Sequence, residues 1–183
     1  KAIELANIKD AENISLNYSL DYYYHARGIY YYQISNYDKA IIDLSRCTDL
    51  DNENTDYYSF RAQVYADMKK YDFALDDYNK ALELSEDIDS KTIALNDRAI
   101  VYGLQEKHEL AVSEYTKAIE LDPTEPLYYS NRAKTYFSNL NDTIKALQDF
   151  NKAIELANIK GAENISLNYS LDYYYYSRAI YYY

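Results

Sequence analysis

An arginine followed by a small residue recurs five times along the 183-residue chain, and this periodicity constrains the fold more than any other feature. The pairs are Arg27-Gly28, Arg61-Ala62, Arg98-Ala99, Arg132-Ala133 and Arg178-Ala179, at steps of 34, 37, 34 and 46 residues. Tyr31, Tyr65, Tyr102, Tyr136 and Tyr182 each stand three residues after the small residue. Spacings of three and four place side chains on one face of a helix. The chain therefore repeats a unit that begins with a helix.

A second helical stripe follows each of the first four helices. It combines small, large and small residues at offsets of zero, four and seven: Ala40, Leu44 and Cys47; Ala74, Tyr78 and Ala81; Ala111, Tyr115 and Ala118; Ala146, Phe150 and Ala153. Such offsets trace one face of an amphipathic helix. With only three glycines and two prolines in the chain, the pattern predicts an all-α protein made of helix pairs.

A longer duplication encloses these units. Residues 152–183 repeat residues 1–32 with four differences: Gly161 for Asp10, Tyr176 for His25, Ser177 for Ala26 and Ala179 for Gly28. Identity this high in helix and loop alike indicates a recent duplication. We therefore expect the chain to be a fragment of a longer tandem array.

The repeats resemble the tetratricopeptide repeat (TPR), a helix-turn-helix unit of about 34 residues. "NYDKAIIDL", "KYDFALDDY" and "KHELAVSEY" are similar to its turn and second helix, and "AIELDP" to its exit. The family's tryptophan is replaced by tyrosine or leucine. The resemblance implies a right-handed α-solenoid of antiparallel helix pairs, the TPR superhelix. A single array over 1–183 would comprise a half repeat at 1–16, repeats at about 17–54, 55–91, 92–125 and 126–160, then an insertion and a further first helix at 161–183.

Ten helices are predicted from these patterns. They span residues 1–8, 17–34, 37–49, 55–69, 71–85, 91–105, 108–121, 125–139, 142–157 and 168–183. Residues 158–171 and their twin 7–20 replace the usual short exit. We expect both to form a loop of the same shape that leads into the next helix, with Ser166 or Asn168 near its cap.

Composition excludes several functional classes. Thirty acidic against 19 basic residues give a net charge of −11, which disfavours nucleic acid because binding it requires basic clusters. No apolar run is long enough to span a membrane. The only cysteine, Cys47, fits a reducing compartment, so the cytoplasm is the predicted location. No phosphate loop, catalytic triad or metal spacing occurs, so the sequence predicts neither an enzyme nor a cofactor.

The repeated arginines have a structural explanation. An acid stands at a fixed register in each second helix, so we expect four ion pairs between helices: Arg27–Asp43, Arg61–Asp77, Arg98–Glu114 and Arg132–Asp149. Arginine also grips phosphate and carboxylate ligands, but one acid per arginine favours packing.

The family resemblance implies a partner-binding groove along the first helices. The implied contact residues are Tyr22, His25, Ile29, Tyr32, Gln33, Ser59, Gln63, Asp67, Asn96, Ile100, Ser130, Lys134 and Phe137. Some TPR proteins clamp the acidic tail of a heat-shock chaperone with basic residues, but Lys134 is the only base in this set. We therefore predict a protein or peptide partner that is neutral or basic.

Two other roles remain open at this stage. The chain could be a structural spacer or self-associating array, with contacts through exposed end helices. It could also be a regulatory module of an enzyme that lies outside this fragment. Full gene length would discriminate between these roles.

Overall fold

The computed structural model describes residues 19–162 and 171–180, and these residues form helices with no strand among them. The helices are α2 (Leu20–Gln33), α3 (Tyr37–Leu50), α4 (Thr55–Asp67), α5 (Tyr71–Leu84), α6 (Ile88–Leu104), α7 (His108–Leu121), α8 (Pro126–Ser138), α9 (Thr143–Ala162) and α10 (Leu171–Ala179). The predicted helix at 1–8 and the predicted cap at Ser166 or Asn168 lie outside the described residues.

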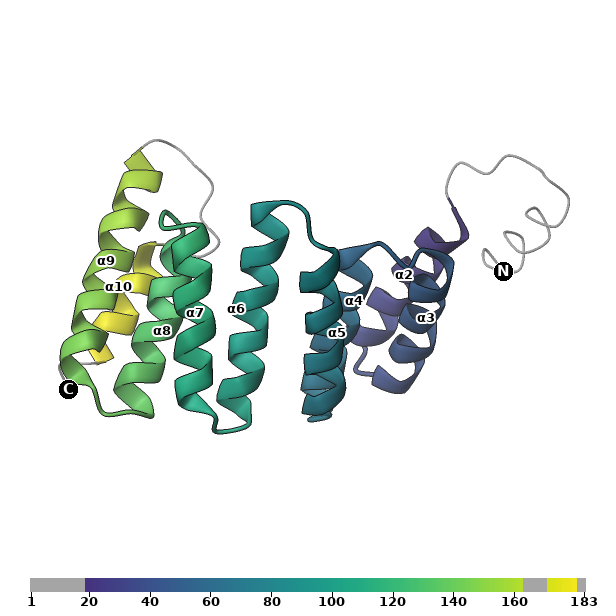
Figure 1. The fold of residues 1–183 in the computed structure, drawn as a ribbon, viewed down its shortest axis with the longest axis horizontal. Helices are drawn as coiled ribbons and strands as arrows, with labels where there is room; N and C mark the ends of the chain where they lie inside the picture. Colours follow the sequence, from purple (N-terminus) through teal and green to yellow (C-terminus); the bar gives the residue numbers. More distant parts are fainter. Residues whose placement is uncertain (1–18, 163–170, 181–183) are drawn as a thin grey trace, which may run out of the picture. The chain divides into compact units, whose positions relative to one another are not determined.

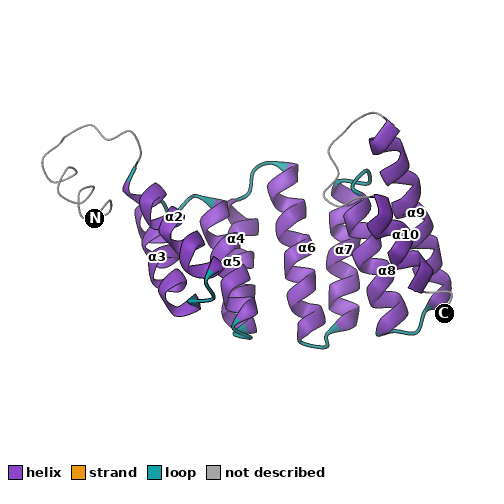
Figure 2. Ribbon diagram, turned by 180° about the vertical axis from the view of Figure 1, so that it is seen from behind, coloured by secondary structure: helices purple, strands orange, loops and turns teal. Residues whose placement is uncertain are grey.

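The chain divides into two compact units, residues 1–85 and 86–183. The first unit contains the helix pairs α2/α3 and α4/α5, and the second contains α6/α7, α8/α9 and α10. Within each pair the second helix runs back alongside the first (Figure 1). The same units coloured by secondary structure show helices joined by short loops (Figure 2). We call α2, α4, α6, α8 and α10 first helices, and α3, α5, α7 and α9 second helices.

Two helix boundaries differ from the prediction. Helix α6 begins at Ile88 rather than at 91, because the Asp87 side chain accepts a hydrogen bond from Ser90 N at 2.7 Å and caps an earlier start. Helix α9 continues to Ala162, so the exit loop expected after residue 157 is wrong over its first residues. Lys160 on this extension pairs with Glu125 at 2.8 Å, a contact that holds the added turn against the α7–α8 connection.

Each turn within a pair uses one residue in the left-handed region. Ser35, Lys69, Glu106 and Asn141 have φ between 52° and 61°. The turn then reverses the chain in three or four residues, which keeps the two helices of a pair in contact. None of the four is glycine, so Ser35, Lys69 and Glu106 carry the steric cost of this conformation, which asparagine at position 141 tolerates better.

Small residues lie at the centre of each pair and let the helices approach. Ala62, Ala99 and Ala133 on first helices are fully buried. They belong to the repeated arginine-small motif. At Gly28 an added Cβ would lie 3.3 Å from Leu44 Cγ, which explains glycine at this one copy.

Candidate partner-binding surface

Four arginines of the first helices form paired hydrogen bonds with acids of the second helices. Arg27 reaches Asp43 with Nε and Nη2, both at 2.7 Å. Arg61 reaches Asp77 at 2.8 and 2.7 Å, and Arg132 reaches Asp149 at 2.7 and 2.9 Å. Arg98 Nε lies 2.9 Å from Glu114, and its Nη2 contacts the same carboxylate. We call these four pairs the arginine ladder.

In Arg61 and Arg132, and in the fifth repeated arginine Arg178, the Nη1 nitrogen points to the preceding second helix. Arg61 Nη1 donates to Thr48 Oγ1 at 2.8 Å, and Arg132 Nη1 donates to Thr116 Oγ1 at 2.9 Å. Arg178 Nη1 donates to Asn151 Oδ1 at 3.0 Å. Sequence reasoning missed these acceptors. Thr116 and Asn151 directly follow the large residue of their stripe, and that register could have revealed them.

The arginine ladder keeps the guanidinium groups of Arg61 and Arg132 charged and hydrogen-bonded to neighbouring helices. The hydrogen bond from Arg61 to Asp77 raises the pKa of Arg61, although burial acts in the opposite direction. Because the guanidinium donors of Arg61 and Arg132 end on neighbouring helices, they are engaged in packing rather than directed at a ligand.

On the first unit, the predicted contact residues of α2 and α4 form a polar network. Tyr32 Oη donates to Asp67 Oδ2 at 2.8 Å, and Gln63 Nε2 donates to Tyr32 Oη at 3.2 Å. Burial, then the hydrogen bond to Asp67, raises the pKa of Tyr32 to about 12. The phenol therefore remains a neutral donor, and the three residues form one hydrogen-bonded line across two repeats.

Aromatic rings of α2 and α4 pack next to this network. The His25 ring lies 5.1 Å from that of Tyr57 and 5.8 Å from that of Phe60, both on α4. Tyr32 meets Phe60 edge to face at 5.3 Å. Burial lowers the pKa of His25, despite the nearby charges of Asp56 and Asp21, so the imidazole favours its neutral form. Phe60 was not among the predicted contacts because it occupies a register that is small or polar in other repeats.

The remaining predicted residues of this unit are less closely linked. Tyr22 and Gln33 are exposed on α2, whereas Ile29 and Ser59 are half-buried. Tyr32 also packs against the buried cluster of Ala40, Leu44 and Val64. Tyr32 therefore has a structural contribution besides any contact it makes with a partner.

In the second unit two of the expected contact residues are buried. Ser130 is 0% exposed and Asn96 is buried, so neither presents its side chain to a partner in this structure. Asn96 instead accepts a hydrogen bond from Asn131 Nδ2 at 2.9 Å, which joins α6 to α8. This register faces the neighbouring first helix, and helical spacing alone did not separate it from the exposed face.

The other three expected residues of this unit have different surroundings. Ile100 is exposed on α6. Lys134 contacts the hydroxyl of Tyr173, with its Nζ 4.3 Å from the centre of that ring. Phe137 packs against the buried cluster of Ala133, Ala146 and Phe150. The one base of the predicted set is thus already engaged by an aromatic ring.

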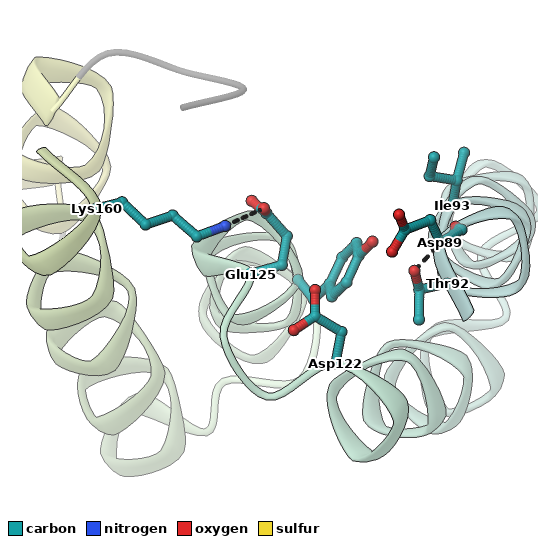
Figure 3. Close-up of a pocket in the computed structure, with 7 residues that line it drawn as sticks. Asp89, Thr92, Ile93, Asp122, Glu125 and Lys160 are labelled. Carbon is teal, nitrogen blue, oxygen red and sulfur yellow. Dashed lines mark hydrogen bonds and ion pairs between the residues drawn. The ribbon is translucent and has the colours of Figure 1, made fainter. Parts of the chain in front are cut away.

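A separate pocket opens at the helix ends of the second unit (Figure 3). Its volume is about 280 Å³, and it is lined by Asp89, Thr92, Ile93, Asp122, Glu125, Tyr128 and Lys160. Lys160 neutralises Glu125, which also caps α8 through Leu127 N at 3.1 Å. Asp122 accepts from Thr124 N at 2.9 Å. Two of the three carboxylates therefore have structural roles.

Membrane-spanning helices and metal sites are both absent from the described part of the chain. There, no helix has both the length and the apolar character needed to cross a bilayer. Within the same residues no group of His, Cys, Asp or Glu is placed to hold a metal ion.

Solved structures with the same architecture are repeat proteins of low identity. A crystal structure of MamA is 21% identical, with a TM-score of 0.70 over 88% of this chain and 90% of that one. PilF of Pseudomonas aeruginosa is 21% identical, with a TM-score of 0.64 over 75% of this chain and 61% of that one. The first TPR domain of Spaghetti (RPAP3), bound to the HSP90 peptide SRMEEVD, is 26% identical, with a TM-score of 0.57 over 64% and 91%.

Family models give the more specific assignment. A comparison with curated proteins gives no match for this sequence. Three models described as tetratricopeptide repeat match residues 22–54, 55–124 and 114–148, and together they cover the helix pairs from α2 into α9. This chain belongs to the tetratricopeptide repeat family, with the all-α solenoid fold of that family.

Proposed function

We propose that the chain is a non-catalytic scaffold that binds a protein or peptide along the face formed by its first helices. The polar line of Tyr32, Gln63 and Asp67 carries this proposal. Gln63 and Asp67 are exposed, so their remaining hydrogen-bonding capacity can reach a partner's backbone or side chains. Helices hold these groups in place, which limits the ordering cost of binding.

Charge favours a neutral or basic partner. Asp67 is an exposed carboxylate on this face, and the protein carries a net charge of −11. Lys134, the only base of the predicted contact set, is covered by Tyr173. An acidic peptide would find little attraction here, whereas long-range attraction would accelerate the approach of a basic one.

The proposal is tested by selection from a displayed library of random peptides, followed by affinity measurements on variants. Gln63→Ala and Asp67→Asn should each weaken the selected peptides about tenfold, because each removes groups that a buried contact needs. Asp76→Asn is the matched control, since it removes the same charge from an exposed position on α5. The acidic peptide SRMEEVD should bind no better than a scrambled peptide.

Two outcomes would contradict the proposal. Selected peptides that bind both variants and the control equally would place the binding surface elsewhere. Strong binding of SRMEEVD would overturn the charge preference. Thermal unfolding of each variant shows whether a lost affinity reflects a lost fold.

A further inference from the structure

Buried carboxylates in this protein are paired with cations. Five acids of the described residues are buried, and each forms an ion pair with a lysine or an arginine: Asp43, Asp77, Glu114, Glu125 and Asp149. In four of the five pairs the cation is an arginine of the ladder. Removing a carboxylate from water is costly unless an opposite charge compensates it, so this pairing is the arrangement that physical chemistry predicts.

Asp97 on α6 departs from this rule. Its side chain is half-buried, and burial raises the pKa of its carboxyl. Asn96 Nδ2 donates to the carboxylate at 3.0 Å, but within residues 19–162 and 171–180 no lysine, arginine or histidine forms an ion pair with it. Binding sites are places where a fold keeps a charge that it does not compensate itself. Asp97 is therefore a candidate binding group for a cation from outside the chain.

A second unused group lies beside Asp97. Tyr115 on α7 is 4% exposed, and its hydroxyl makes no hydrogen bond in the part of the chain that the structure describes. Burial raises the pKa of this phenol, and the charge of Asp97 raises it further, so the hydroxyl and the carboxylate are near each other. An unpaired buried hydroxyl costs free energy. One donor placed between the two groups would satisfy both.

The surrounding side chains hold Asp97 in place without supplying a cation. Asn131 Nδ2 on α8 donates to Asn96 Oδ1 at 2.9 Å, and Asn96 in turn donates to Asp97. Lys134, one turn further along α8, contacts Tyr173 instead, with its Nζ 4.3 Å from the centre of that ring. Two amides therefore orient the carboxylate before a ligand arrives, which lowers the ordering cost of binding.

We propose that Asp97 receives an arginine side chain of the partner, whose guanidinium donates to the Asp97 carboxylate and to the Tyr115 hydroxyl. This inference rests on the function proposed above and names one group of that partner. A guanidinium is more weakly hydrated than an ammonium, so its entry into a half-buried site costs less, and its planar donors reach two acceptors at once. The ladder uses the same chemistry, since arginine supplies the paired hydrogen bonds to its four carboxylates.

A titration of the 183-residue chain with N-acetyl-arginine-N-methylamide tests the proposal. The readout is the side-chain amide NMR signals of Asn96 and Asn131. Both should shift with a dissociation constant on the order of millimolar, as suits a single small fragment, whereas the amide of Asn151 on α9 should not move. The citrulline derivative has nearly the same shape without the charge and should cause no shift. The lysine derivative should bind about fivefold more weakly.

Three variants locate the site. Asp97→Asn should weaken binding of the arginine derivative about tenfold or more. Because burial disfavours the charge of Asp97, this variant should not melt at a lower temperature, so its lost affinity would not reflect a lost fold. Tyr115→Phe removes only the hydroxyl and should weaken binding about threefold. Glu120→Gln is the matched control, since it removes an exposed charge of α7 in the same unit, and it should bind like the unmodified chain.

The displayed peptides separate this inference from the function on which it rests. Arginine should recur in the selected peptides, and its replacement by citrulline should weaken them about tenfold in the unmodified protein but not in Asp97→Asn. Peptides that respond to Gln63→Ala and Asp67→Asn but not to Asp97→Asn would retain the scaffold function and overturn this inference. If no peptide is selected, the proposed function fails, while the titration still supports or overturns the Asp97 site. An arginine derivative that shifts neither amide at about 50 mM, or that binds Asp97→Asn equally well, would overturn it.

Discussion

At the scale of single residues, each ladder arginine is a shared component of neighbouring helices. Arg61 contacts Asp77 on its own second helix and Thr48 on the preceding one, so one side chain links α3, α4 and α5. Burying a charge is costly unless its partner and its hydrogen bonds are supplied. The ladder supplies both, and loss of either partner leaves an uncompensated charge between helices.

The first prediction concerns the buried pair Arg61–Asp77, whose side chains are 17% and 9% exposed. Asp77→Asn should lower the free energy of unfolding by about 3–5 kcal/mol, because Arg61 then keeps an uncompensated buried charge. Glu83→Gln is the control, since its pair with Lys80 is exposed at 69% and 40%. That change should cost less than about 1 kcal/mol. Urea denaturation measures both, and equal losses would refute the distinction.

The second prediction concerns the pH dependence introduced by Asp97. Burial raises the pKa of this carboxyl above its ordinary 3.8, although a hydrogen bond from Asn96 opposes the rise. The folded state therefore binds the proton more tightly than the unfolded state, and ionisation at neutral pH costs stability. Asp97→Asn should stabilise the protein above the folded-state pKa. The gain should disappear as the pH falls below about 3.8, where both states become protonated.

Unfolding curves of the two proteins from neutral pH to about pH 3 check this sign. The corresponding position of the next repeat is Asn131, so an amide is sterically compatible with the register. A gain that is constant with pH, or a loss at neutral pH, would contradict the assignment of Asp97 as a destabilising charge.

At the scale of elements, turns and helix ends show what the sequence could and could not predict. The period of the hydrophobic stripe located the helices, because each must bury one face. It did not predict which residue of each turn adopts the left-handed conformation. Glycine usually marks such a position, but here it is occupied by Ser35, Lys69 or Glu106. Nor did it give the extension of α9, which depends on the contact of Lys160 with Glu125, 35 residues earlier in the sequence.

The third prediction concerns these turns. Glu106→Gly should stabilise the second unit by roughly 0.5–1 kcal/mol, because glycine adopts positive φ without a steric penalty. Asn141→Gly should gain less, since asparagine already tolerates the left-handed region. Glu106→Gln removes the charge without changing the backbone preference and should leave stability unchanged. Thermal melts would contradict the argument if Glu106→Gln matched Glu106→Gly.

At the scale of the whole molecule, the repeat pattern was sufficient to predict the all-α TPR fold. Family membership follows from the matched repeats and the fold from the solved relatives. The partner-contact residues were harder to predict from the sequence. A position on a first helix can face either solvent or the next first helix, and Ser130 and Asn96 face inward. Only the packing of repeats, which depends on side chains far apart in sequence, distinguishes the two cases.

The fourth prediction follows because each repeat is stabilised by contacts with its immediate neighbours. Breaking one ladder pair should loosen its own repeat and the adjacent helices, rather than the chain as a whole. Asp149→Asn should speed amide hydrogen exchange in α8 and α9, and in α7 and α10, which contact them. Exchange in α2 and α3 should stay at the level of the unmodified protein. Uniform acceleration along the chain would show that the array unfolds as one cooperative body.

The reaction rate of the buried cysteine can report how often the first unit opens locally. Cys47 is the only cysteine of the chain, it is fully buried, and burial raises the pKa of its thiol to about 12. The Cys47 thiolate is the nucleophile that attacks a maleimide or disulfide reagent, so the reaction can occur only when α3 separates from its neighbours and the thiol meets water. The rate at which one equivalent of reagent is consumed therefore counts the openings of a single helix in an otherwise unlabelled protein.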